Sequence, residues 1–172
     1  MGSRPRETMV TGHLAGTLGN LSLNLAAGHY HVRVMAISIV QLGTPRKQGE
    51  GLRLGAVRHP PRGVRKNDLA GLDYYDTWFP NLAPSAELLK AARASRDDRS
   101  WSVFQRKYRR EMSHPDRSRI LDVLAALSHQ TSFSVGCYCA DETRCHRSVL
   151  RELLLERGAD VVQGKGPADK ES

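Results

Sequence analysis

Residues 131–157 read TSFSVGCYCADETRCHRSVLRELLLER, and this stretch decides the fold. Its first part, Thr131 to Tyr138, is rich in aromatic, β-branched and small residues and predicts a buried strand. Its last part, Cys145 to Arg157, has leucines and a valine on one face and predicts a helix that ends at Gly158. A strand joined to a helix by a short loop is the repeating unit of α/β domains.

Outside this stretch, strand patterns alternate with helix patterns along the chain. Predicted strands cover Met35–Leu42, Leu52–Val57 and Asp160–Gln163. One predicted helix opens at Pro84–Glu87 and runs to about Ala94, and others begin at Asp97–Ser100 and at Pro115. Parallel strands need long crossover connections, which are usually helical. The alternation therefore predicts an α/β fold in a single domain, with a small, mainly parallel sheet flanked by helices.

The 172 residues have the length of one ordinary domain. We assign the α/β domain to residues 35–163. Residues 1–34 include a long Gly-, Ala- and Asn-containing stretch with no clear amphipathic repeat, so they are expected to be a flexible extension or a non-native leader before a start at Met35. Residues 164–172 are polar and are expected to form a disordered tail.

Charge and cysteine content narrow the class of protein. The formal net charge of +8 favours anionic partners such as phosphorylated ligands or nucleic acid. No apolar run approaches the length of a membrane-spanning helix, so no membrane partner is expected. The three cysteines lie within nine residues, which is unlike a secreted disulfide framework and predicts a cytoplasmic setting.

The loop between the predicted strand and helix is the candidate catalytic site. In α/β sheets, ligands bind where a strand ends and the next helix begins, because the helix N-terminus offers free N–H groups and a positive dipole. Arg144, Arg147 and the helix terminus all favour a thiolate at Cys139 or Cys145. We predict Cys139, Cys145, His146 and Arg147 as the catalytic residues, with nucleophilic, proton-transfer and charge-stabilising roles.

Three other interpretations of the loop stay open. A phosphatase cradle would need Cys-x5-Arg, but Cys139 to Arg144 has only four intervening residues. Cys137, Cys139, Cys145 and His146 are residue types that bind zinc or iron, yet the adjacent Cys145 and His146 should diverge on a helix, so no metal or other cofactor is expected. The cysteines could also be purely structural.

The segment Cys139–Ser148, which ends in Cys-His-Arg-Ser, resembles the hallmark of the bacterial family known as domain of unknown function 488 (DUF488). Other stretches are similar to its YeaO-like branch, and the resemblance extends from about Ile37 to Val162. These stretches are Gly51–Leu54, Pro61–Lys66, Ala83–Leu88 and Trp101–Tyr108 with Glu111. The resemblance implies an α/β fold and a cytoplasmic setting, and it implies no particular reaction.

The chain departs from this branch at one basic loop. The branch usually reads Asp-Arg-Leu-Trp-Pro-Arg-Gly, whereas residues 57–63 here read Val-Arg-His-Pro-Pro-Arg-Gly. An acidic residue and a tryptophan are therefore replaced. If either contacted a ligand, Asp73, Asp76 or Trp78 are the candidates to take its place.

Two functional hypotheses follow. In the first, the protein is an enzyme acting on an anionic small molecule, phosphorylated or nucleotide-like. The predicted substrate-binding residues are Arg58, Arg62, Lys66 and Tyr138. In the second, the protein is a non-catalytic nucleic-acid-binding or regulatory module that uses Arg46–Lys47 and the basic residues 106–110. The oligomeric state does not follow from the sequence.

Overall fold

The computed structural model describes residues 21–22, 33–94 and 97–162. The chain divides into two units, residues 1–33 and 34–172. Two short strands, β1 (Leu21–Ser22) and β2 (Arg33–Val34), come before it in the chain. Most of the predicted extension at 1–34 and the whole of the predicted tail at 164–172 lie outside the described residues.

The second unit is built on a four-stranded sheet in which all strands are parallel. Its strands are β3 (Ile37–Gln41), β4 (Leu52–Gly55), β5 (Thr77–Trp78) and β6 (Phe133–Cys137), in the order β3-β6-β4-β5. Val161 adds a parallel bridge to Ile37 at the β3 edge, where the sequence predicts a last short strand. The predicted α/β fold is confirmed.

Among the described residues, four α-helices and two short 3₁₀ helices follow or connect the strands. They are η1 (Lys66–Asp68), η2 (Pro80–Leu82), α1 (Ala86–Ala94), α2 (Asp98–Met112), α3 (Pro115–Ser128) and α4 (His146–Leu155). The Asp97 side chain accepts the backbone N–H of Ser100 at 2.6 Å and so caps α2, as its position in the sequence predicts. Gly158 ends the α4 region with φ of +77°, a conformation that glycine adopts without strain.

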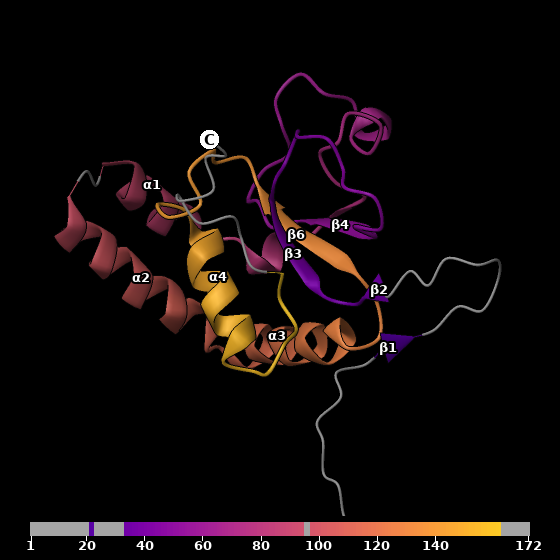
Figure 1. The fold of residues 1–172 in the computed structure, drawn as a ribbon. Coiled ribbons are helices and arrows are strands. Elements are labelled where there is room, and N and C mark those ends of the chain that lie inside the picture. Colours follow the sequence, from indigo (N-terminus) through magenta and orange to yellow (C-terminus); the bar gives the residue numbers. More distant parts are fainter. Residues whose placement is uncertain (1–20, 23–32, 95–96, 163–172) are drawn as a thin grey trace, which may run out of the picture. The chain divides into compact units, whose positions relative to one another are not determined.

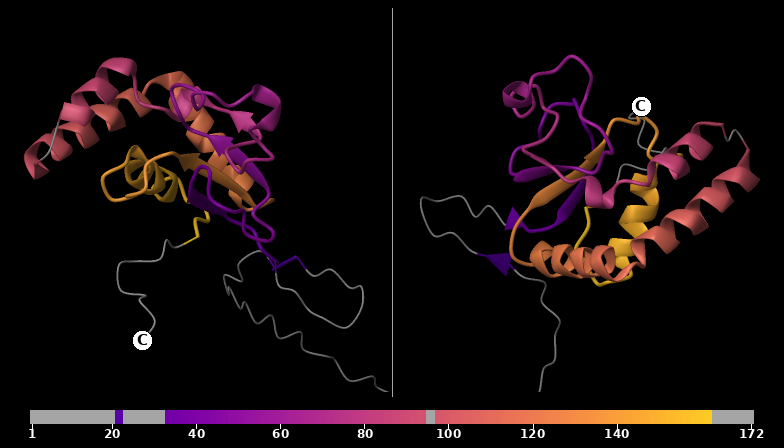
Figure 2. Two further views of the ribbon diagram at one scale, coloured as in Figure 1. Left: turned by 90° about the horizontal axis from the view of Figure 1, so that it is seen from above. Right: turned by 180° about the vertical axis from the view of Figure 1, so that it is seen from behind.

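The helices cover one face of the sheet, and loops cover the other. The chain moves from β3 past β6 to β4 and on to β5, and then returns to β6 and to Val161. Because parallel crossovers are right-handed, outward and return connections lie on opposite faces. In Figures 1 and 2, α1–α4 lie on one side of the strands and the segments after β3 and β4, with η1, lie on the other. The prediction of a sheet flanked by helices therefore holds for one face.

The loop face packs against the sheet at two glycines. A Cβ atom on Gly136 of β6 would lie 2.3 Å from the Leu42 side chain, and one on Gly55 of β4 would lie 2.5 Å from the Tyr75 ring. Both distances are far below normal contact. The missing side chains therefore allow Leu42 and Tyr75 to lie directly on the strands, in a second apolar cluster with Val57, Leu69, Cys137 and Cys145.

A buried ion pair lies under the same loops. The Arg53 guanidinium, on β4, donates to both carboxylate oxygens of Glu50 at 2.6 and 2.8 Å and to the carbonyls of Thr44 and Asp73. Glu50 also accepts the hydroxyl of Ser134 on β6 at 2.6 Å. Both charged side chains are almost fully buried. The pair therefore joins two strands to two loops, with each charge balanced by the other.

Within the described part of the chain, no helix is both long enough and apolar enough to cross a lipid bilayer.

Replacing Glu50 by glutamine should destabilise the domain by about 3–5 kcal/mol, because the buried Arg53 guanidinium would lose its counter-charge. Urea unfolding at neutral pH measures this change. The matched control is Asp68→Asn, which breaks the exposed Arg65–Asp68 pair and should cost less than about 1 kcal/mol. Equal effects of the two substitutions would contradict the prediction.

The cost of Glu50→Gln should also depend on pH. Burial alone would raise the pKa of Glu50, but hydrogen bonds from Arg53, Ser134 and the Lys47 backbone hold it below its ordinary value of 4.5. A lowered folded-state pKa gives stability that is present above pH 4.5 and is lost as the pH falls through the folded-state value. The stabilities of the two proteins should therefore converge in acid, and a constant difference would contradict this.

Candidate functional site

The three cysteines meet at the end of β6. Cys137 closes the strand, Cys139 follows in the loop, and Cys145 is the N-cap of α4. The backbone of Cys145 is extended, with φ of −123° and ψ of 148°, so its side chain does not follow the helical direction. The three sulfur atoms lie within 4.8 Å of one another, and the Cys137 thiol donates to Cys139 at 3.8 Å.

The cluster contains one accessible thiol and two buried ones. Cys137 and Cys145 are buried, whereas Cys139 is exposed. Hydrogen bonds from Cys137 and Cys145 and the positive charge of Arg147 hold the pKa of Cys139 below its ordinary value, although burial opposes them. The pKa of Cys137 is raised, first by its hydrogen bonds to the other two sulfurs and then by burial. The pKa of Cys145 is also lowered, first by its hydrogen bond with Cys137. Cys139 is the exposed member of the pair, so it is the accessible thiol whose thiolate form is favoured.

Arg147 is a buried cation next to this thiolate. Its side chain, on the first turn of α4, donates to the carbonyl of Cys139. Its Nε atom is buried without a hydrogen-bond partner, and none of the ion pairs found in the described residues includes Arg147. A buried charge is stable only when it is compensated. The charge of Arg147 favours the thiolate form of Cys139, and that thiolate can compensate the buried guanidinium.

His146 is held in one orientation against the same cluster. Its Nε2 lies 2.9 Å from the carbonyl of Ala56, at the end of β4. A carbonyl only accepts, so Nε2 bears the proton and the neutral ring has its lone pair on Nδ1. Nδ1 faces the sulfur of Cys145 at 3.7 Å. The edge of the Tyr108 ring packs against the imidazole, with centroids 5.6 Å apart.

A cavity of about 820 Å³ joins the cysteine loop to the basic loop after β4. All three cysteines and His146 line it, together with Val57–Arg62, Tyr138 and Arg144. Residues from the α1 and α2 regions, including Ala83, Pro84, Trp101 and Phe104, complete the wall. The Tyr138 hydroxyl donates to the carbonyl of His59 at 3.3 Å and so links the two loops directly.

The basic residues predicted to bind substrate occupy three different environments. Arg62 lines the cavity, and its side chain makes no hydrogen bond or ion pair with the described residues. Arg58 also lines it, but its guanidinium donates to the carbonyls of Ala83 and Pro84, so it joins two segments of the wall. Lys66 lies on η1, beyond the turn at Gly63, and is not part of the lining. Arg62 is therefore the predicted anion-binding side chain best placed for a ligand.

Two aromatic rings of α2 line the cavity. Trp101 and Phe104 stack with centroids 4.9 Å apart, and both belong to the cavity wall. Phe104 and Tyr108 are buried, while Trp101 is half-buried. The spacing of the three rings at i, i+3 and i+7 indicates a shared helix face, which suits a core better than a ligand site, and nothing in the sequence separates the cavity wall from the core.

Three residues were candidates to take the place of the acidic residue and the tryptophan that the basic loop lacks, and all three lie outside the cavity. Asp76 accepts the Arg53 backbone N–H and pairs with Arg46, and Asp73 also lies near Arg46. The Trp78 indole donates to the carbonyl of Val57 at 2.8 Å. None of the three acidic or aromatic candidates lines the cavity.

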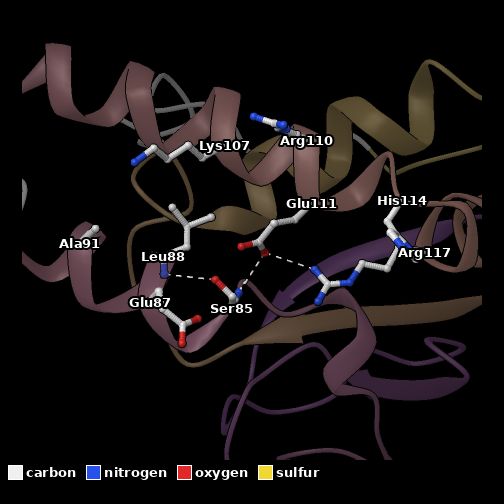
Figure 3. Close-up of a pocket in the computed structure, with 9 residues that line it drawn as sticks. All are labelled: Ser85, Glu87, Leu88, Ala91, Lys107, Arg110, Glu111, His114 and Arg117. Carbon is white, nitrogen blue, oxygen red and sulfur yellow. Dashed lines mark hydrogen bonds and ion pairs between the residues drawn. The ribbon is translucent and has the colours of Figure 1, made fainter.

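A second hollow, of about 780 Å³, lies between the start of α1, the end of α2 and the start of α3 (Figure 3). Lys107 and Arg110 lie on its α2 side. At its centre, Glu111 accepts the backbone N–H of Ser85 at 2.9 Å and pairs with Arg117 at 3.2 Å. The carboxylate is thus engaged in joining the three helices, and no thiol lines this hollow.

Residues 37–158, well over half of the chain, match the family model described as the active DUF488-N3 subclade. The chain belongs to the DUF488 family. It is 31% identical over 120 residues to the uncharacterized protein YeaO of Escherichia coli (strain K12), a match that covers 70% of this chain and 97% of YeaO. These findings confirm the resemblance seen in the sequence. No solved structure matches the chain.

Replacing Arg147 by methionine should raise the pKa of Cys139, because the thiolate would lose its buried counter-charge. We expect the midpoint of the pH profile for Cys139 alkylation to rise by about one to three pH units. Iodoacetamide labelling in the presence of a metal chelator, with the modified residue identified by mass spectrometry, gives this midpoint.

The matched control for this variant is Arg151→Met. Arg151 lies one turn further along α4 and pairs with Glu142, so its loss should leave the midpoint in place. A midpoint that is unchanged in the folded Arg147→Met protein would contradict the role of Arg147.

Proposed function

We propose that this DUF488 protein is an enzyme that acts on an anionic small molecule, phosphorylated or nucleotide-like, in the cavity between its two loops. The observation that supports this most is the shared cavity. A thiol cluster and a basic loop, which follow different strands, line the same 820 Å³ space. The description of the matching subclade as active supports an enzyme over a structural module.

The thiol end of the cavity supplies the reactive groups. Cys139 is the proposed nucleophile, because it is the exposed thiol and Arg147 favours its thiolate. His146 is the proposed proton carrier, because the lone pair on its Nδ1 faces the thiol of Cys145 and its ring is held by Ala56. Cys145 lies between these groups, within 4.8 Å of the other two sulfurs, and positions them.

The basic end of the cavity supplies the affinity for the substrate. Arg62 would bind the anionic group, since its guanidinium is exposed and lines the cavity. Tyr138 and the face of Trp101 would contact a planar group such as a nucleobase. A nucleotide-like molecule has both a planar group and an anionic group, so it fits the two kinds of wall.

The alternative of a nucleic-acid-binding module has weaker support. Its predicted basic residues are largely engaged: Arg109 pairs with Glu152 and Glu156, and Arg46 pairs with Asp76. Lys107 and Arg110 line the second hollow beside Glu111. A cytoplasmic setting, which suits three free thiols, is part of the main proposal.

Alkylation by a charged reagent tests the proposed substrate class. We define the anion preference of a thiol as its alkylation rate with iodoacetate divided by its rate with neutral iodoacetamide. This preference should be higher for Cys139 than for a free thiol in solution. Replacing Arg62 by glutamine should lower this preference about fivefold, the effect of about 1 kcal/mol of attraction between exposed charges. Second-order rates at low and high salt provide the measurement, and salt should weaken the preference.

Arg65→Gln is the control for Arg62→Gln. Arg65 is equally cationic and close in the chain, but its exposed side chain pairs with Asp68. The Arg65→Gln substitution should leave the preference of Cys139 for iodoacetate unchanged. The proposal fails if Cys139 shows no preference for the anionic reagent, or if both substitutions reduce it equally.

A further inference from the structure

The three sulfur atoms at the end of β6 have the spacing of ligands around one metal ion. A tetrahedral zinc site with Zn–S bonds of about 2.3 Å places its sulfur atoms about 3.8 Å apart. Cys137 and Cys139 lie at 3.8 Å, and all three sulfurs lie within 4.8 Å. Small side-chain rotations would bring the third sulfur to the same spacing. We infer that Cys137, Cys139 and Cys145 bind one thiophilic divalent cation of the Zn²⁺ class.

The chemistry of the cluster selects the type of cation. Its three members offer only sulfur, and no carboxylate or imidazole belongs to the group. Soft thiolate ligands select zinc-class ions over magnesium or calcium, which bind oxygen. His146 is not a member of this group: its Nδ1 lies 3.7 Å from the sulfur of Cys145, and its Nε2 is held by the carbonyl of Ala56.

Charge also fits a bound cation. Three thiolates and one divalent ion have a net charge of −1, which the buried guanidinium of Arg147 balances. Arg147 already donates to the carbonyl of Cys139 and has an unpartnered buried Nε. The protons released by the thiols on binding pass to solvent.

The fourth coordination position would face the cavity. All three cysteines line that cavity, and Cys139 is exposed to it. Structural zinc sites are closed by four protein ligands, whereas this site has three. The bound ion would therefore be exchangeable and accessible to small molecules.

The cation would regulate the thiol chemistry. This regulatory consequence rests on the proposed function, in which Cys139 is the nucleophile. The inferred cation site does not depend on the proposed function. A thiolate whose electron pair is shared with a metal ion is a weaker nucleophile. Cation binding would hold the enzyme in a form without thiol reactivity, and its removal would release Cys139.

Cobalt titration tests the site directly. The full chain, reduced and stripped of metal, is titrated with Co²⁺, whose thiolate complexes absorb strongly in the near ultraviolet. We expect an intense sulfur-to-cobalt charge-transfer band that saturates at one equivalent, and Zn²⁺ should displace it. No such band, or a band that needs a large excess of Co²⁺, would overturn the inference.

Two cysteine variants identify the ligands. Cys137→Ser removes a ligand but keeps Cys139, Arg147 and all seven histidines, so it should lower the affinity for Co²⁺ at least about 100-fold. Cys139→Ser, at an exposed loop position, should do the same without risk to the fold. A band retained at full intensity in either folded variant would show binding elsewhere and overturn the inference.

Alkylation of Cys139 separates the site from the proposed function. Zn²⁺ at one equivalent should slow iodoacetamide labelling of Cys139 at least about tenfold in the wild-type protein, but not in Cys137→Ser. A cobalt band together with unprotected Cys139 would overturn the regulatory role. A cobalt band in a protein with no preference for iodoacetate would leave the metal site in place and reject only the proposed function.

Discussion

The backbone hydrogen bonds that hold β6 between β3 and β4 determine the rest of the structure. This ladder continues past the strand ends, with the Ala56 N–H on the Gly136 carbonyl and the Leu42 N–H on the Cys137 carbonyl, both at 2.9 Å. Since all the strands are parallel, the loops after β6 and β4 leave the sheet at the same edge. Residues 80 positions apart in the chain therefore form one cavity wall.

The chemistry of the site depends on charge that is buried without a carboxylate. Arg147 is almost fully enclosed. A carboxylate partner would neutralise it and leave only the hydrogen bonds from Cys137 and Cys145 to lower the pKa of Cys139. Here the compensating groups are sulfur atoms. The same arrangement suits a thiolate nucleophile and a cation-binding thiolate cluster, because both need the negative form of sulfur. The ionic pair Arg53–Glu50 on the loop face is different, since each charge there has a permanent partner.

The fold was largely predictable because its signals are local. Asp97 and Pro115 mark helix starts by properties of their own side chains and rings. β5 was not predicted, because its two exposed residues, Thr77 and Trp78, have no pattern. The sequence does not predict the thiol cluster, because its helix pattern begins at Cys145, whereas this residue is an N-cap with extended backbone. That difference turns its side chain toward β6, and it depends on loop geometry.

The hydrogen bond from His146 to the Ala56 carbonyl ties the geometry of one loop to that of another. Ala56 comes immediately before the basic residues 57–63, while His146 begins α4. Any displacement of the basic loop would move this carbonyl and so change the orientation of the imidazole beside the sulfur of Cys145. By thermodynamic reciprocity, a change at the thiol cluster that reoriented His146 would in turn bias the position of the basic loop. One backbone carbonyl thus links the two ends of the cavity.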